Sequence, residues 1–366
     1  MKNTFGNAVS VTIFGESHGA AIGAVVDGLA AGLPIDEEVI RHQLSLRRPA
    51  GRISTTRHEQ DEFQILSGVY QGRTTGSPVA IVIPNADTRS GDYQTEIARP
   101  GHADYTAECK YHGFQDARGG GHFSGRVTAA LVAAGALVLP ALKEKGITIG
   151  THVARCAGVI DAPLSEDIAA LTEQLSTLNG MTFAVLDDAA GENMKAAIEA
   201  AQKEGDSVGG VLETAIVGLP AGLGEPWFDS LESLLSHGLF SIPAVKGVEF
   251  GDGFALCDRR GSQVNDAYAI RDGKVVTKTN HNGGIGGGIS NGMPVLLRCA
   301  VKPTPTIAKP QQTIDMKNKT EVEYGGRGRH DPCIVHRARV VVDSVVALVV
   351  ADLLTQRFGT EGWGQE

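Results

Sequence analysis

Aromatic residues and cysteines are scarce in this 366-residue chain, and both shortages narrow its possible functions. Aromatic residues make up 5% of the sequence, and none lies in its most basic stretch, 41–58. This disfavours the base stacking by which proteins bind single-stranded nucleic acid. The five cysteines, at positions 109, 156, 257, 299 and 333, are far apart and form no C-x-x-C pair. We therefore expect no disulfide framework, no bound metal and a reducing cytoplasmic location.

Long hydrophobic runs and a net positive charge are also missing. The longest apolar stretch without a charge, 127–142, is shorter than the roughly 18–20 residues that a membrane-spanning helix needs. The N-terminal residues lack the apolar core of a signal peptide. The net charge of −9 argues against nucleic-acid binding, which requires a basic face. We therefore expect neither a membrane nor a nucleic-acid partner.

One stretch reverses this acidic balance. Residues 41–58, RHQLSLRRPAGRISTTRH, contain five arginines and two histidines but no acid. Such a run can be a solvated basic surface. Because guanidinium groups pair bidentately with carboxylates and phosphates, it can instead bind a small molecule that carries several negative charges.

The hydrophobic pattern predicts strands and helices in blocks rather than in strict alternation. We expect strands at 10–14, 22–26, 77–84, 209–218 and 293–301, and helices at 36–48, 125–145, 165–178, 191–204 and 339–357. The helix at 125–145 is apolar nearly all round, so we place it in the centre of the core. Since no repeat, linker or clear boundary interrupts the chain, we expect a single large α+β domain spanning 1–366.

The turn between the first two predicted strands contains GESHG, residues 15–19. This string matches G-x-S-x-G, the nucleophile pattern of serine hydrolases, which requires a strand before it and a helix after it. In a chain with 47 glycines the pattern is expected about 0.3 times by chance, and strand-like residues follow it here. Ser17 as a nucleophile and His18 as the working residue are the two hypotheses.

Further polar, glycine-rich segments are candidates for ligand contacts. RPGHADYT presents His102 after a Pro-Gly turn, and RGGGHFSGR leads into the long apolar helix, whose N-terminus favours phosphate. HNGGIGGGISNG is rich enough in glycine for a ligand to press against its backbone. VKPTPTIAKP is a stiff segment with two lysines, and GRGRHDP combines arginines with Asp331.

Taken in order, these segments resemble the chorismate synthase family over nearly the whole chain. FGESHG, RRPAGR, ADTRSGDY, RPGHADYT, GLPAGLGEP, GGISNGMP and GRHDPC all occur in the family's order. The resemblance implies a β-α-β sandwich with helices packed between antiparallel sheets, and a homotetramer. It also implies an enzyme that eliminates phosphate from 5-enolpyruvylshikimate 3-phosphate, an anionic small molecule, to give chorismate. Reduced FMN is the implied cofactor, with NADPH or an external flavin reductase as the source of electrons.

The resemblance further implies roles for individual residues. His18 is similar to the family's general acid toward the departing phosphate, His102 to the histidine that protonates reduced flavin near N1, and Asp331 to the aspartate that assists proton removal through flavin N5. Substrate-binding positions are Arg47, Arg48, Arg52 and Arg126. Flavin-binding positions are His122, Phe123, Ser124, Ala244, Gly287, Lys302, Pro303, Thr304, Pro305, Thr306 and Arg329.

The sequence departs from the family pattern at several positions. His122 and Phe123 stand where an arginine and a serine are usual, Pro243 replaces an asparagine, and Asp343 replaces a glutamate. The first three departures concern expected flavin contacts, whereas His18, His102 and Asp331 are retained. A non-catalytic anion-binding protein is the third alternative, beside the lyase and the serine hydrolase.

Overall fold

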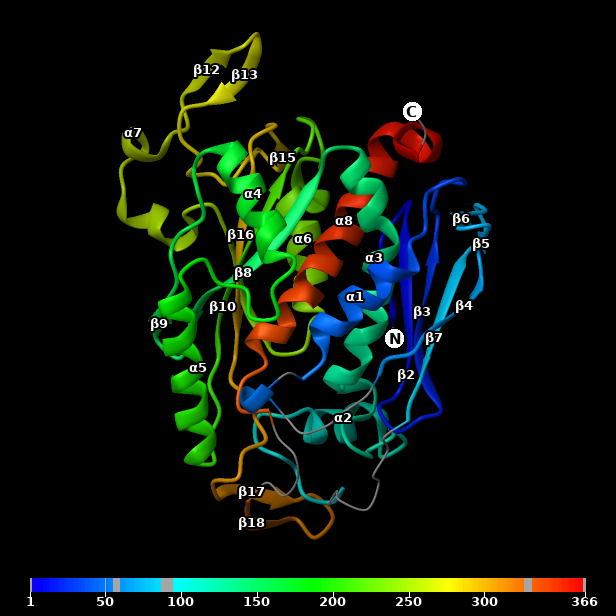
Figure 1. Cartoon of the computed structure of the whole chain (residues 1–366). Helices are drawn as coiled ribbons and strands as arrows, with labels where there is room; N and C mark the ends of the chain where they lie inside the picture. Colours follow the sequence, from blue (N-terminus) through cyan, green and yellow to red (C-terminus); the bar gives the residue numbers. More distant parts are fainter. Residues whose placement is uncertain (1, 50, 55–59, 87–94, 326–330, 365–366) are drawn as a thin grey trace.

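A computed structural model describes residues 2–49, 51–54, 60–86, 95–325 and 331–364 of the chain. Two five-stranded antiparallel sheets form its outer β-layers, with helices packed between them (Figure 1). The first sheet has the order β1-β2-β3-β7-β4, with bounds Thr4–Phe5, Ser10–Gly15, Ala21–Asp27, Val79–Pro84 and Gln64–Ser67. The second has the order β11-β16-β10-β8-β9, with bounds Val245–Phe250, Val295–Val301, Gly210–Val217, Thr148–Cys156 and Val159–Ile160.

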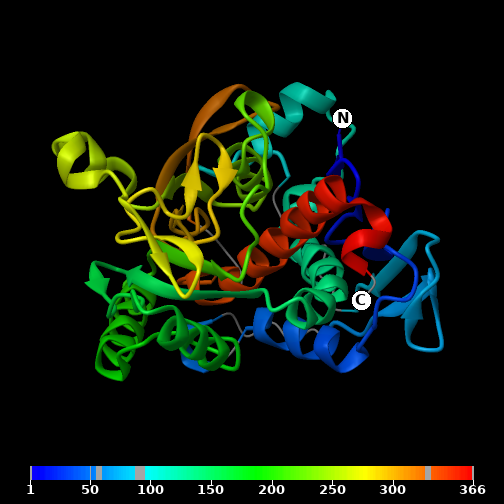
Figure 2. The same ribbon diagram turned by 90° about the horizontal axis from the view of Figure 1, so that it is seen from above.

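The central layer consists of α1 (Glu37–Arg47), α3 (Thr128–Glu144), α6 (Leu231–Phe240) and α8 (Val335–Gly364). Helix α3 packs against the first sheet and against α8, and α8 packs against β8 and β10 of the second sheet (Figure 2). The expected α+β sandwich with helices between antiparallel sheets is therefore confirmed. Helices α4 (Ile168–Leu178) and α5 (Asp188–Lys203) lie outside the second sheet.

Local sequence explains why these elements form. Asp36 caps α1 by accepting a hydrogen bond from the Glu38 N–H, which satisfies one of the free donors of the first turn. In β3, alternate residues face the helices, and Ile22, Ala24 and Val26 are fully buried. Helix α3 is long and apolar enough to span a membrane, but 83% of its most apolar window is buried within the protein. Its predicted place in the core is confirmed.

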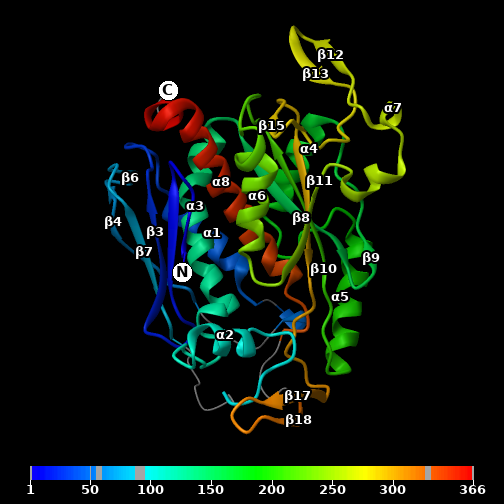
Figure 3. The ribbon, with the colours of Figure 1, turned by 180° about the vertical axis from the view of Figure 1, so that it is seen from behind.

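Smaller elements surround the sandwich. They are α2 (Asp104–Tyr111), α7 (Gly261–Val264) and the strand pairs β5–β6 (Val69–Tyr70, Arg73–Thr74), β12–β13 (Tyr268–Arg271, Lys274–Thr277), β14–β15 (Ile285–Gly286, Ile289–Ser290) and β17–β18 (Gln311–Asp315, Thr320–Tyr324). The β12–β13 hairpin projects from the end opposite to α2, as the views from both sides show (Figures 1 and 3).

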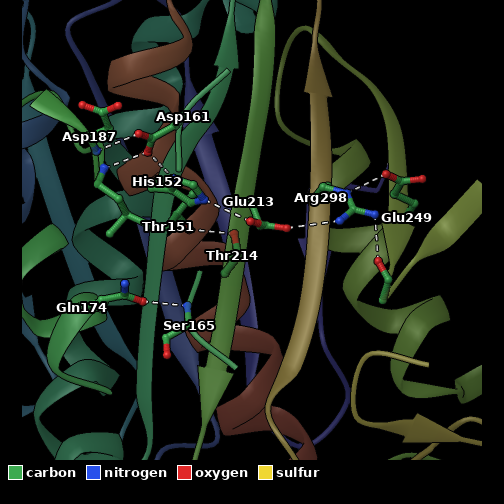
Figure 4. Close-up of polar contacts among 12 residues, drawn as sticks. Thr151, His152, Asp161, Ser165, Gln174, Asp187, Glu213, Thr214, Glu249 and Arg298 are labelled. Carbon is green, nitrogen blue, oxygen red and sulfur yellow. Dashed lines mark hydrogen bonds and ion pairs between the residues drawn. The ribbon is translucent and has the colours of Figure 1, made fainter. Parts of the chain in front are cut away.

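The two faces of the second sheet carry different polar groups (Figure 4). On the face toward α8, Thr151 donates to Asp343 at 2.6 Å, and Asp343 pairs with the buried Arg339. On the outer face, four directly opposed residues alternate in charge across β8, β10, β16 and β11: His152, Glu213, Arg298 and Glu249. This charged ladder links the four strands across the outer face of the sheet.

Candidate active site

A cleft of about 690 Å³ opens where the C-terminal end of α1 meets the start of α3 and the segment that follows β16. The loop before α2, the loop between α6 and β11, and the start of α8 complete its walls. Among the described residues, six arginines and lysines and two acids line it: Arg47, Arg48, Arg126, Arg337, Lys246 and Lys302 against Asp61 and Asp331. In a chain of net charge −9, this cleft is a local positive site for an anionic ligand.

Three of the predicted substrate arginines lie in this cleft. Arg47 and Arg126 are buried and share the carboxylate of Asp61, with Arg47 Nη2 at 3.1 Å from one oxygen and Arg126 Nη1 on the other. Burial alone would raise the pKa of Asp61, but the two guanidinium groups lower it. Arg48 donates to the carbonyl of Gln60. Asp61 thus fixes two guanidinium groups while the cleft keeps its positive balance.

His102 is oriented by a carboxylate. Its Nδ1 lies 2.9 Å from Asp104 Oδ1, and Asp104 also receives two 2.7 Å hydrogen bonds from Arg99. Burial opposes ionisation of Asp104, yet these hydrogen bonds hold the pKa of its carboxyl well below its usual range. Arg99 Nη2 also lies 3.2 Å from Nδ1, but the ionised carboxylate at the shorter distance of 2.9 Å favours a proton on Nδ1, which leaves Nε2 as the ring nitrogen that can accept a proton.

The segment after β16 closes the cleft from the other side. Lys302 donates to the Gly101 carbonyl at 2.6 Å, and its backbone N–H donates to Ala244, which adopts a left-handed φ of 74°. Thr304, Pro305 and Thr306 line the cleft, and the buried Thr304 hydroxyl has no hydrogen-bond partner among the described residues. An orphan hydroxyl inside a cleft is well placed for a bound ligand.

Asp331 and the 122–124 segment are the other predicted residues that line the cleft. Asp331 lies 3.2 Å from the guanidinium of Arg337. His122, Phe123 and Ser124 all line the cleft, and Phe123 is 40% exposed, which leaves an aromatic surface for a flat ligand.

His18 lies beside this cleft rather than on its surface. Its turn connects β2 to β3, whose residues pair in register up to Gly15 and Ile22, so a β-hairpin stands where a hydrolase would need a helix. Ser17 is 1% exposed and contacts His18 Nδ1 at 3.1 Å. A Cβ at Gly119 would lie 2.4 Å from the His18 ring, so glycine is required there. The hairpin removes the structural support for Ser17 as a nucleophile.

Other predicted residues lie elsewhere. Arg52 is exposed and does not line the cleft, and Pro303 is exposed beside it. Gly287 is exposed in the β14–β15 hairpin, at the end of the molecule opposite to α2 (Figures 1 and 3). Arg329 lies outside the described residues. The roles expected of these four residues stay predictions.

Three residues of the cleft were not predicted from the sequence: Asp61, Lys246 and Arg337. Asp61 lies three residues beyond the acid-free run 41–58. An acid so close to five arginines was the sequence feature that could have indicated an ion pair with them. Arg337 lies six positions after Asp331, within the first turn of α8 and two residues before the helix predicted at 339–357, so no predicted element contained it.

Comparison with known proteins identifies the family. A sequence model described as chorismate synthase matches residues 9–355. The chain belongs to the chorismate synthase family. As a member, it is an enzyme of the lyase class.

Individual chorismate synthases are similar over their whole length. That of Thermococcus kodakarensis is 46% identical over 359 residues, covering 98% of this chain and 99% of the relative. That of Pyrococcus abyssi is 47% identical over 354 residues, covering 96% and 97%. A solved structure titled "Crystal Structure of Chorismate Synthase" superimposes with a TM-score of 0.76 at 31% identity, covering 97% of this chain and 94% of that one.

Proposed function

We propose that this enzyme eliminates phosphate from 5-enolpyruvylshikimate 3-phosphate to give chorismate, with reduced FMN as its cofactor. The observation that supports this proposal most strongly is the positive cleft in a member of the chorismate synthase family. Three predicted substrate arginines, His102 and Asp331 line this cleft. A substrate with two carboxylates and a phosphate requires several guanidinium groups, and the same groups stabilise the charge of the departing phosphate.

The lining fits a flavin. Phe123 offers a flat apolar surface, Thr304 an unpartnered hydroxyl among the described residues, and Lys302 a positive charge. We assign FMN contacts to these three and to His122, Ser124, Ala244, Pro305 and Thr306. When bound, reduced FMN supplies an electron-rich ring that promotes loss of phosphate without net redox change.

Residues of the chain itself bind the substrate and transfer the protons. Arg47, Arg48 and Arg126 bind and orient the substrate, and Asp61 keeps two of these guanidinium groups in place. His18 is the proposed acid toward the phosphate, and His102, held at Nδ1 by Asp104, exchanges a proton at Nε2. Asp331, paired with Arg337, is a carboxylate for assisting removal of the ring proton.

The test is anaerobic incubation with reduced FMN and the phosphorylated substrate. We expect phosphate release, and His18→Ala should lower turnover by roughly tenfold or more because a proton donor is lost. His42→Ala, an exposed histidine on α1, is the control and should behave as the native enzyme. Absence of phosphate release under fully reducing conditions would exclude the reaction and leave a non-catalytic anion-binding protein. Labelling of Ser17 by a fluorophosphonate would instead support the hydrolase.

The assembly and the electron source are also proposals. Large apolar side chains are exposed on β12 and in two other segments: Trp227, Phe228, Phe254, Tyr268 and Ile270 are each at least 70% exposed. Such a surface supports association of copies of this chain, for which we propose the family's homotetramer. Light scattering measures the number of subunits in solution and tests this assembly.

We further propose a cytoplasmic enzyme that receives reduced FMN from an external reductase. Reduction of the flavin by NADPH and this enzyme alone would contradict the external reductase.

A further inference from the structure

The side chain of Asn85 joins the His18 turn to a cleft arginine. Asn85 directly follows β7, and its Nδ2 donates to the carbonyl oxygens of Glu16 and Gly19, each at 2.9 Å. Its Oδ1 accepts a hydrogen bond from Arg126 Nε at 3.0 Å. Glu16 and Gly19 flank His18 on both sides, so one amide contacts the turn at two points and the arginine at a third.

These contacts require a carboxamide. Both N–H donors of Asn85 point at carbonyl oxygens, and its oxygen faces a guanidinium donor. Reversing the amide would set oxygen against two carbonyls and the NH₂ group against a cation, so the orientation is determined. The backbone N–H of Asn85 also donates to Ala20 at 3.1 Å, which keeps the chain beside the turn whatever the side chain.

The arginine in this chain of contacts is itself held. Arg126 pairs with Asp61 and donates to the Pro84 carbonyl at 3.2 Å, and it lines the cleft. Asn85 does not line the cleft, so it acts on a ligand only through its neighbours.

We propose that Asn85 is a positioning residue that fixes the His18 turn relative to the guanidinium of Arg126. This inference rests on the proposed function, which gives His18 and Arg126 their roles. A proton donor and an anion-binding group must keep a constant separation if they act on the same phosphate, and a doubly anchored amide provides it.

Asn85→Asp tests the proposal most directly. It keeps the size of the side chain and the oxygen that faces Arg126. It replaces the NH₂ group, which donates to the Glu16 and Gly19 carbonyls, by an oxygen that repels them. Asn179→Asp is the matched control. Asn179 is half-buried and donates to the Ile149 carbonyl at 2.8 Å on the second sheet, away from the cleft. We expect kcat/KM to fall roughly tenfold or more in Asn85→Asp, with an altered pH profile, and to change less than about twofold in Asn179→Asp.

A second measurement needs no substrate. Diethyl pyrocarbonate acylates exposed neutral imidazoles, and mass spectrometry of the peptide containing His18 reports its rate of modification in the ligand-free enzyme. We expect this rate to rise in Asn85→Asp, because a released turn exposes a ring that is now buried, and to stay unchanged in Asn179→Asp. If the native enzyme releases no phosphate, the proposed function fails, whereas the acylation rates still test the coupling.

The outcomes separate positioning from general stability. A variant that only folds less well loses kcat in proportion to its folded fraction and keeps the native KM and pH profile. Its acylation also rises at the buried His152 and His336 as much as at His18, and that result would overturn the proposal. Asn85→Ala, which removes the contacts without adding repulsion, must show the same changes if Asn85→Asp does not fold. Failure of both variants to fold would assign Asn85 to general stability and also overturn it.

Discussion

His152 places a titratable ring between two carboxylates on the outer face of the second sheet. Its Nδ1 lies 2.7 Å from Asp161, its Nε2 lies 3.0 Å from Glu213, and the residue is 1% exposed (Figure 4). Burial alone would lower the pKa of the imidazole, but the hydrogen bonds and charges of Asp161 and Glu213 raise it. The same contacts lower the pKa of both carboxyls against the effect of burial.

These shifts give stability a definite pH dependence. Because the folded-state pKa of His152 is raised, its contribution is complete below the unfolded value of about 6.5 and is lost as pH rises through the folded value. We expect the free energy of unfolding of the native enzyme to exceed that of His152→Gln by an amount that shrinks as the pH rises from acidic to basic. Urea denaturation across that range measures it. His42→Gln, on the exposed face of α1, is the control, and a difference that grows with pH would contradict the prediction.

The sequence predicted several residues that line the cleft, but not the partners that hold them in place. Arg47 and Arg126 were expected to bind anions, but the buried Asp61 that joins them was not anticipated. Asp61 reaches Arg126 only through the tertiary fold, because 65 positions separate them in the chain. Likewise, nothing in the sequence near His152 reveals that Glu213 will stand opposite it in the sheet.

At the scale of elements, helices α3 and α8 approach each other closely at a glycine, which has no side chain to keep them apart. A Cβ built on Gly135 of α3 would lie 2.5 Å from Ser344 Cα in α8, closer than such atoms can approach. The two helices therefore pack backbone to backbone at this point, which a purely apolar pattern in either helix cannot show.

Gly135→Ala tests that contact with a clear sign. Helix propensity alone would stabilise the variant by about 1 kcal/mol, because alanine orders more readily than glycine in a helix. We expect the opposite, a loss of about 1–3 kcal/mol, because α3 and α8 must separate to admit the methyl group. Urea denaturation measures the change. Gly286→Ala, where no atom lies within 4 Å of the added Cβ, should be nearly neutral, and stabilisation by Gly135→Ala would refute the close packing.

Sequence identified several strongly periodic elements but missed one long buried strand. The helix predicted at 36–48 is found as Glu37–Arg47, and the strand predicted at 293–301 as Val295–Val301. Strand β8 was not predicted because it is buried on both faces and carries Thr151 and His152, whose polar groups contact Asp343 and Glu213 from distant segments. Alternation cannot reveal a strand whose polar residues are paired inside the protein.

At the scale of the whole molecule, one hydrophobic cluster connects both sheets through the central helices. It contains Ile22 of β3, Leu137 of α3, Val346 of α8 and Leu212 of β10. A smaller cluster lies between α4 and the second sheet. Because no described layer can lose its neighbours without exposing this shared core, we propose that the chain is a single domain, as its sequence predicts.

A single domain should unfold as one cooperative unit. We expect the backbone amides of β3, in the first sheet, and of β10, in the second, to lose protection at the same urea concentration, because both strands depend on α3 and α8 for burial. Pulsed hydrogen exchange with peptide mass spectrometry follows the two strands separately, and repeating it at several protein concentrations separates subunit dissociation from unfolding. Loss of protection in β10 at a clearly different urea concentration from β3 would instead divide the chain into two independently folding units. That division would place the boundary within the helical layer between the sheets, and Gly135→Ala would then shift only the transition of the sheet that stays packed on α3.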